Sequence, residues 1–138
     1  MADMRHVKLG DSGLEVSRLC LGGMSFGVPT KPRPWTVGYD ETRAVIAAAT
    51  DAGINFVDTA NCYADGTSEE YIGRALRELG VPRDRVVLAS KVFYNDGGLS
   101  RTAIMREIDG TLARLGTDYL DLYIIHRFDY GTSIEETM

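Results

Sequence analysis

The chain contains 138 residues, 44% of them hydrophobic and 25% charged, which is the composition of one globular domain with a buried core. Its formal net charge of −5 argues against nucleic acid or an anionic membrane surface as a partner. No apolar run reaches the roughly 20 residues that span a bilayer, and residues 1–5 lack the apolar core of a signal peptide. Because the two cysteines, Cys20 and Cys62, have no metal-ligand spacing, we expect a reduced, cytoplasmic protein without a metal ion.

Strand-like and helix-like segments alternate along most of the chain. Residues 7–16 carry a turn signal, Asp11-Ser12-Gly13, between two short apolar stretches, which predicts a β-hairpin. Beyond it, apolar runs of strand length alternate with longer segments of helical periodicity. We therefore predict strands over 18–22, 54–57, 86–90 and 120–125, and helices over 40–52, 67–80 and 100–116.

Capping residues mark the ends of the predicted helices. Ser, Thr and Asp side chains accept hydrogen bonds from the first amides of a helix, and glycine adopts the left-handed conformation that ends one. Thr67 and Glu70 form a capping box that opens the second helix, and a fourth helix begins at Thr132 or Ser133. The other predicted N-caps are Asp40 and Ser100, and the predicted stops are Gly53, Gly80 and Gly116.

Four residues recur with a regular period at or just past the predicted strand ends. Gly23, Asp58, Lys91 and His126 are separated in turn by 35, 33 and 35 positions. A repeating βαβ unit needs roughly 30 residues or more, so this period fits a parallel α/β fold. In a (β/α)₈ TIM barrel all strand ends open onto one face, which carries the active site. The period therefore predicts such a barrel, with its site assembled from distant parts of the sequence.

The chain accounts for only about four β/α units of that barrel, preceded by the hairpin. A complete barrel takes about 250 residues, so we expect residues 1–138 to be the N-terminal half of one barrel domain. The nearly continuous apolar run at 120–125 predicts a strand buried on both faces. Because a four-stranded parallel sheet leaves two strand edges uncovered, we expect the isolated chain to be unstable or to self-associate.

Three of the strand-end residues, together with a nearby tyrosine, have the chemistry of a catalytic site. Tyr63 follows Asp58 by five residues, so both can reach one cleft with Lys91 from the next strand. A lysine held by a carboxylate stays charged and favours phenolate over phenol, so Tyr63 can act as a general acid. His126 can then orient a carbonyl oxygen. Taken singly, Asp58 could instead form a hydrogen bond with the backbone of a turn, and Lys91 could simply extend into solvent.

Asp58, Tyr63, Lys91 and His126, with the short motifs around them, resemble the aldo-keto reductase superfamily. The resemblance spans nearly the whole chain, and its motifs occur in the family's order and spacing. The motif His126-Arg127-Phe128-Asp129 is similar to one group of bacterial and plant members, whereas many relatives have His-x-Pro-Asp there. The other matching motifs are Leu21-Gly22-Gly23-Met24, Asp58-Thr59-Ala60-x-x-Tyr63, Gly66-x-Ser68-Glu69-Glu70 and Ser90-Lys91.

The resemblance implies a barrel enzyme that reduces small aldehydes or ketones to alcohols with NADPH. Asp58, Tyr63, Lys91 and His126 match the family's catalytic tetrad, with Tyr63 as the proton donor. NADP rather than NAD is implied by the family alone, as the chain has no Gly-x-Gly-x-x-Gly fingerprint. Residues expected near the cofactor are Gly22, Gly23, Met24 and Asp58, and those expected to line an apolar substrate pocket are Trp35, Phe93, Tyr94 and Phe128.

Two other functions remain compatible with the same barrel. Lys91 could form a Schiff base with a carbonyl substrate, as in aldolase-type lyases. Potassium-channel beta subunits resemble this family too, which makes a nucleotide-binding regulatory subunit the other alternative. A homo-oligomer is compatible with each of these functions.

Overall fold

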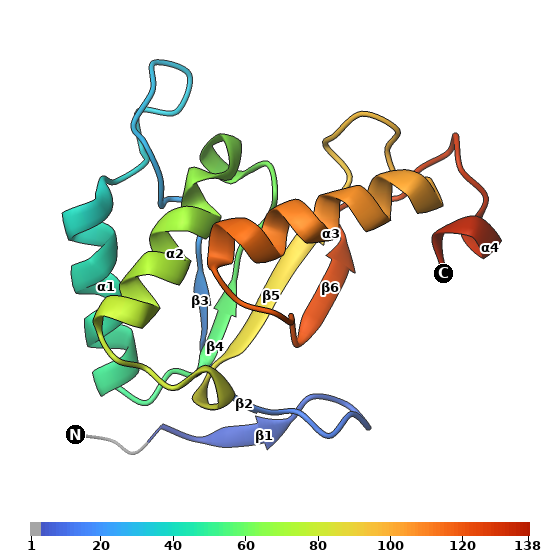
Figure 1. The fold of residues 1–138 in the computed structure, drawn as a ribbon. Coiled ribbons are helices and arrows are strands. Elements are labelled where there is room, and N and C mark those ends of the chain that lie inside the picture. The colour runs from blue at the N-terminus through green and yellow to red at the C-terminus, as the bar shows by residue number, and fades with distance from the viewer. Residues whose placement is uncertain (1–3) are drawn as a thin grey trace.

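The computed structural model of the chain describes residues 4–138, which form one parallel sheet, a separate hairpin and three long helices (Figure 1). Residues 1–3, part of the N-terminal start considered above, lie outside the described residues. The strands are β1 (His6–Lys8), β2 (Glu15–Ser17), β3 (Cys20–Gly22), β4 (Phe56–Asp58), β5 (Val87–Val92) and β6 (Leu122–Ile125). The helices are α1 (Tyr39–Asp51), α2 (Thr67–Glu78), α3 (Arg101–Leu115) and α4 (Ile134–Thr137), with 3₁₀ turns η1 (Tyr63–Gly66) and η2 (Arg83–Arg85).

The sheet has the strand order β3-β4-β5-β6, and all its neighbouring strands run parallel. Gly22 pairs with Asp58 in the register of β3 and β4, so the ends of these strands lie side by side. The hairpin of β1 and β2 is antiparallel and lies below the sheet in Figure 1, at the end where the parallel strands begin. The predicted hairpin and all four predicted parallel strands are thus confirmed. The loops that follow the parallel strands lie at the other end of the sheet, away from the hairpin.

Helices α1, α2 and α3 lie along one face of the sheet (Figure 1). Their apolar sides pack on the sheet to form the core, and α2 packs closely against the end of α3. Gly73 makes this approach possible, because a Cβ atom there would overlap the backbone of Leu115. The buried core consists of Phe26, Ile46, Val57, Ile72, Ala75, Leu76, Val86, Leu88 and Leu115.

Helix α3 and helix α4 begin as the capping pattern predicts. The Oγ atom of Ser100 accepts a hydrogen bond from the amide of Ala103, and Gly116 ends α3 in the left-handed conformation. Ser133, rather than Thr132, caps α4 by accepting a hydrogen bond from the amide of Glu136. These ends were predictable because a local hydrogen bond determines each of them.

Two predicted N-caps are wrong. Helix α1 begins at Tyr39 and its N-cap is Gly38, so Asp40 lies inside the first turn. Helix α2 has Gly66 as its N-cap, and the hydroxyl of Thr67 donates to the carbonyl of Ala64 instead. The capping box therefore does not form, because the Thr67 hydroxyl donates to the Ala64 carbonyl and accepts from the amide of Val28.

Strand β6 also differs from its prediction, because it is half-exposed rather than buried on both faces. It forms hydrogen bonds with β5, and no other strand pairs with it among residues 4–138. The apolar side chains of this strand are therefore only partly covered by residues 4–138. The expectation that the isolated chain self-associates stays a prediction.

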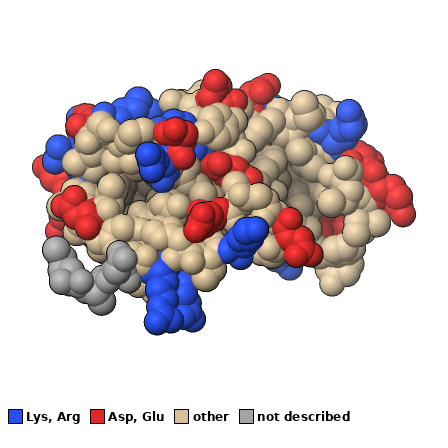
Figure 2. Space-filling model, turned by 90° about the horizontal axis from the view of Figure 1, so that it is seen from below, with Lys and Arg blue, Asp and Glu red and all other residues tan. Residues whose placement is uncertain are grey.

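Charged side chains of both signs are interspersed over the face of the molecule that Figure 2 shows, the underside of the view in Figure 1. Among residues 4–138, no group of three or more His, Cys, Asp or Glu side chains is arranged to hold a metal ion. A helix long and apolar enough to cross a bilayer is likewise absent from the described part of the chain.

Candidate active site

Asp58 and Lys91 form an ion pair at the carboxyl end of the sheet. Asp58 is the last residue of β4, and Lys91 lies near the end of β5, the neighbouring strand. The Lys91 Nζ atom lies 2.6 Å from Asp58 Oδ2 and also donates to the carbonyl of Thr59 at 2.9 Å. The side chain of Lys91 is only 16% exposed and that of Asp58 only 27%. Lys91 therefore does not simply extend into solvent, and its charge is held at a defined place.

Tyr63 lies beside this ion pair. Its hydroxyl oxygen is 3.4 Å from Lys91 Nζ, and the ammonium also lies 4.9 Å from the centroid of the tyrosine ring. The loop that carries Tyr63 is attached to β5, because the amide of Asn61 donates to the Lys91 carbonyl. This attachment explains why residues 28 positions apart in the sequence meet.

The backbone immediately after Tyr63 is strained. Ala64 and Asp65 have φ angles of 46° and 57°, which are in the left-handed region although neither residue is a glycine. Such a conformation costs roughly 1–2 kcal/mol for each residue. Local sequence preference does not select this turn, so the surrounding structure must hold it. Its result is that the chain reverses directly after Tyr63 and leaves the phenol beside Lys91.

His126 follows β6 and completes the group. Its amide donates to the carbonyl of Val92, and its ring meets the ring of Tyr63 edge-on at a centroid separation of 5.6 Å. Burial lowers the pKa of His126, and the positive charge of Lys91 lowers it further, whereas Asp58 has the opposite effect. The imidazole is thus neutral near pH 7, since the ordinary value is about 6.5.

Cys62 contacts the same imidazole, a relation that the sequence did not indicate. Its Sγ atom lies 3.8 Å from His126 Nδ1. Burial raises the pKa of the Cys62 thiol above its usual value, so the sulfur keeps its proton and can donate it to Nδ1. When the imidazole proton is on Nε2, Nδ1 accepts from the thiol and Nε2 is left as a donor. The two residues are 64 positions apart, and no local pattern relates them.

A cavity of about 330 Å³ opens beside Tyr63. Trp35 and Tyr94, both predicted to line a substrate pocket, lie in its wall. Phe93 is not in the wall, although its ring packs edge-on against Tyr94 at 5.1 Å. Arg33 was missed by the sequence analysis, which had no partner to assign to it. The lining residues are Met24, Arg33, Trp35, Cys62, Tyr63, Ala64 and Tyr94.

Phe128 lies outside the cavity that it was predicted to line. Its ring packs on Tyr130 with the centroids 4.9 Å apart, and it lines a separate cavity of about 40 Å³ with Leu99 and Ile125. Nearby, Asp129 accepts hydrogen bonds from the amides of Leu99 and Gly131. The motif that contains Phe128 thus turns away from Tyr63 directly after His126.

Besides Asp58, three residues are expected near the cofactor, and they differ in what surrounds them. A Cβ atom on Gly22 would meet nothing within 4 Å, so the space beside Asp58 is open there. A Cβ atom on Gly23 would instead meet the side chain of Ile72 at 2.8 Å, so this glycine serves the packing of α2 on the strand end. Met24 is 56% exposed and lines the cavity beside Tyr63. Gly22 and Met24 therefore both lie beside open space at the end of β3.

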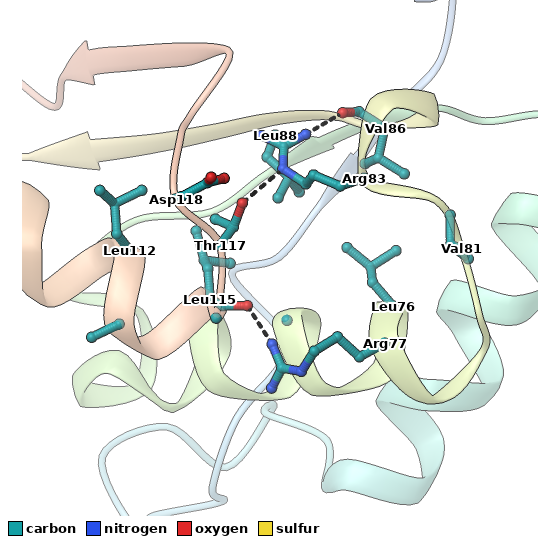
Figure 3. Close-up of a pocket in the computed structure, with 13 residues that line it drawn as sticks. Leu76, Arg77, Val81, Arg83, Val86, Leu88, Leu112, Leu115, Thr117 and Asp118 are labelled. Atoms are coloured by element: carbon teal, nitrogen blue, oxygen red, sulfur yellow. Dashed lines mark hydrogen bonds between the residues drawn. The ribbon is translucent and has the colours of Figure 1, made fainter.

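A larger cavity of about 500 Å³ lies between α2, α3 and the start of β5 (Figure 3). Its wall is mostly apolar, and its two arginines are occupied by structural hydrogen bonds. Arg77 donates to the carbonyl of Leu115 at 2.7 Å, and Arg83 donates to the Val86 carbonyl and to Thr117. None of Asp58, Tyr63, Lys91 and His126 lines it, whereas Tyr63 lies in the wall of the smaller cavity. The smaller cavity is therefore the candidate active site.

Comparison with known proteins identifies the family. The model of the Aldo/keto reductase family matches residues 18–138, so the chain belongs to this family. It is similar to an aldo-keto reductase of Fusarium vanettenii, with 38% identity over 99% of this chain and 44% of the relative. It is also 41% identical to a probable voltage-gated potassium channel subunit beta of Oryza sativa subsp. japonica, over 98% of this chain and 41% of that protein.

Comparison with solved structures also finds aldo-keto reductases. An aldo-keto reductase from Bacillus halodurans, solved in its holo form, superposes with a TM-score of 0.78 and 32% identity. The match covers 97% of this chain and 44% of that structure, so the chain spans less than half the length of its relatives. Its four β/α units therefore correspond to part of a (β/α)₈ barrel, and the predicted fold class is confirmed.

Proposed function

We propose that the protein containing this chain reduces aldehydes or ketones to alcohols with NADPH, and that Tyr63 is the general acid. The observation that carries this proposal is the position of Lys91 Nζ, 2.6 Å from Asp58 and 3.4 Å from the Tyr63 hydroxyl. A charged lysine beside a phenol stabilises the phenolate that remains after proton transfer. The family membership supports an oxidoreductase, and the site geometry supplies the proton donor that carbonyl reduction requires.

Each residue then has a distinct part in the reaction. The Nε2–H group of His126 donates a hydrogen bond to the carbonyl oxygen and orients it toward Tyr63. Tyr63 transfers its hydroxyl proton to that oxygen as negative charge develops there, and Lys91 stabilises the resulting phenolate. Asp58 holds the Lys91 ammonium in place. NADPH, when bound, supplies the hydride that adds to the carbonyl carbon.

We assign the nicotinamide end of the cofactor to the open space beside Gly22, Met24 and Asp58. Two observations support this assignment, the absence of any atom within 4 Å of a Cβ on Gly22 and the exposure of Met24. Gly23 contributes indirectly, because its lack of a side chain lets α2 approach the strand end. The choice of NADP over NAD follows the family resemblance. We propose that residues 1–138 belong to one domain and that a homo-oligomer is compatible with it.

A Schiff-base mechanism fits the geometry less well. A lysine that attacks a carbonyl must be neutral, whereas Lys91 is bound to the carboxylate of Asp58 and the carbonyl of Thr59. Both acceptors favour the ammonium form. Borohydride treatment in the presence of a carbonyl substrate should accordingly leave Lys91 unmodified, and a trapped adduct on Lys91 would reverse this assignment.

The test is the rate of NADPH oxidation with an activated aromatic aldehyde, measured on the protein that contains this chain. Replacing Tyr63 with Phe should lower turnover by about 10²–10⁴-fold, the usual contribution of a general acid. Tyr94→Phe is the matched control, because it removes a hydroxyl from the same cavity and should retain turnover. Unchanged turnover in Tyr63→Phe would contradict the proposal that Tyr63 is the general acid. Tight cofactor binding without turnover in the unsubstituted protein would favour a regulatory subunit instead.

A further inference from the structure

The active-site cavity has one charged side chain in its wall. Of its seven lining residues, all within the described chain, six are apolar, aromatic or thiol side chains, and Arg33 is the exception. The Arg33 side chain is 33% exposed, so it is partly enclosed rather than fully solvated. An arginine in a mostly apolar cavity is a recognition group for a planar anion, because its guanidinium can donate two parallel hydrogen bonds to a carboxylate.

The backbone of Arg33 is anchored while its side chain has capacity to bind a ligand. The Arg33 amide donates to the carbonyl of Thr30, and its own carbonyl accepts a hydrogen bond from the hydroxyl of Thr36. Its guanidinium forms a single hydrogen bond within the described residues, from Nη1 to Asp65 at 3.0 Å. A guanidinium carries five N–H donors, so most of them remain available.

Asp65 is a weak competitor for this guanidinium. Its side chain is 76% exposed, and ion pairs between groups in contact with solvent contribute little to stability. An incoming carboxylate enclosed by the cavity wall would be less solvated than Asp65 and would compete well for Arg33. Asp65 then serves as the resting partner of the arginine when no ligand is bound.

The charge of Arg33 also extends toward the catalytic end of the cavity. Arg33 and Lys91 both lower the pKa of the Cys62 thiol, although the effect of burial is larger and raises it overall. Cys62 directly precedes Tyr63 and contacts His126. One cavity therefore contains a proton donor for a carbonyl and, in the same wall, a positive charge suited to an anion.

We propose that Arg33 makes this site selective for carbonyl substrates that also carry a carboxylate, such as aromatic aldehyde acids. The carboxylate pairs with Arg33, the apolar part of the substrate lies against Trp35 and Tyr94, and the carbonyl reaches Tyr63. This assignment of the substrate class rests on the proposed reductase function. It adds a residue that determines specificity and takes no part in proton transfer.

The test uses ligand binding without cofactor or turnover. Trp35 is the only tryptophan of the chain and lines the cavity, so its fluorescence reports occupancy directly. The protein that contains this chain is titrated, without cofactor, with 4-formylbenzoate and with the neutral 4-formylbenzamide, and the fluorescence that Trp35→Phe removes is the signal followed. We expect 4-formylbenzoate to bind about five- to tenfold more tightly, which is the scale of a charge-assisted hydrogen bond at a partly exposed site.

Variants separate a specific contact from general attraction of anions. Arg33→Met should abolish the preference for 4-formylbenzoate, Arg33→Lys should keep part of it, and Asp65→Asn should increase it by releasing the guanidinium. Lys31→Met is the matched control, because it removes a positive charge from the same loop without touching the cavity wall. Circular dichroism of each variant checks that it retains the fold.

Three outcomes would overturn the assignment. These are equal binding of both probes to the unsubstituted protein, the same loss in Lys31→Met as in Arg33→Met, and displacement of 4-formylbenzoate by pyrophosphate at lower concentration. The last would assign Arg33 to a phosphate group of the cofactor. Because no turnover is involved, failure of this test leaves the Tyr63 experiment unaffected, and failure of that experiment leaves this one interpretable.

Discussion

The two ends of the parallel sheet differ in what their side chains are free to do. Where the strands begin, a large apolar cavity is bounded by arginines whose donors are bound to backbone carbonyls and to Thr117. Where the strands end, a smaller cavity adjoins an ion pair, a phenol and a neutral imidazole, next to a strained turn. The size of a cavity is therefore not what distinguishes the candidate active site. The candidate site is distinguished by polar side chains that converge beside a strained turn.

The largest expected effect lies at the carboxyl end of the sheet. Lys91→Met removes the charge that we propose stabilises the Tyr63 phenolate, so turnover should fall by roughly 10²–10⁴-fold. NADPH oxidation measures the effect, and thermal unfolding shows whether the fold persists. Arg85→Met is a control that removes a positive charge from η2 at the opposite end. Comparable loss of turnover in both variants would remove the distinction between the two ends.

A buried ion pair behind the site should matter for stability rather than for chemistry. Glu69 is fully buried on α2, where it accepts hydrogen bonds from Arg114 at 2.6 Å and from Ser90. Glu69→Gln leaves the Arg114 guanidinium without its counter-charge, and the free energy of unfolding should fall by about 3 kcal/mol. Glu70→Gln, an exposed neighbour, should change it by less than about 0.5 kcal/mol. Chemical denaturation distinguishes these values, and equal effects would contradict the account.

At the end where the strands begin, a substitution should change stability slightly and turnover not at all. Arg77→Met removes the hydrogen bond to the Leu115 carbonyl, which is worth about 1 kcal/mol. Turnover should stay the same, because the larger cavity has no part in the proposed reaction. A marked loss of turnover without unfolding would show that the two ends are coupled.

The smallest effect concerns the titration of His126. Because burial and Lys91 lower its pKa, its NMR titration midpoint should lie below the ordinary value of about 6.5. Lys91→Met should move the midpoint upward, and His6→Gln identifies the signal because the chain has two histidines. The neutral imidazole is the form that the fold favours. Its contribution to stability is therefore present above pH 6.5 or so and is lost as the pH falls through the lowered pKa.

A midpoint at or above the ordinary value would contradict the neutral state assigned to His126. In a protonated imidazole both ring nitrogens carry a proton, so Nδ1 could no longer accept a hydrogen bond from Cys62. Cys62→Ser provides a further comparison, because a hydroxyl at this position can still donate to Nδ1.

The barrel topology was predictable because the residues at the strand ends recur at a spacing that matches one β/α unit. Asp58, Lys91 and His126 follow apolar runs at a nearly constant spacing, and parallel strands place such residues at one edge. Helix ends at Ser100, Gly116 and Ser133 were also predictable, since each depends on a hydrogen bond or a backbone conformation within a few residues.

What the sequence did not reveal depends on contacts between distant segments. The contact of Cys62 with His126 joins loops 64 positions apart, and Arg33 enters the cavity from a loop without regular structure. Thr67 does not cap α2, because its hydroxyl is engaged by the preceding loop and by the amide of Val28. Phe128 turns away from the cavity although it lies only two residues beyond His126.

The central claim is that Lys91 acts on the reaction through Tyr63, and a double-mutant cycle tests it most directly. Turnover is measured for Lys91→Met, for Tyr63→Phe and for the double variant under the same conditions. The account predicts that the double variant is no slower than Tyr63→Phe alone, because Lys91 has no phenolate left to stabilise. Losses that multiply in the double variant would show that the two residues act independently, and would contradict the mechanism.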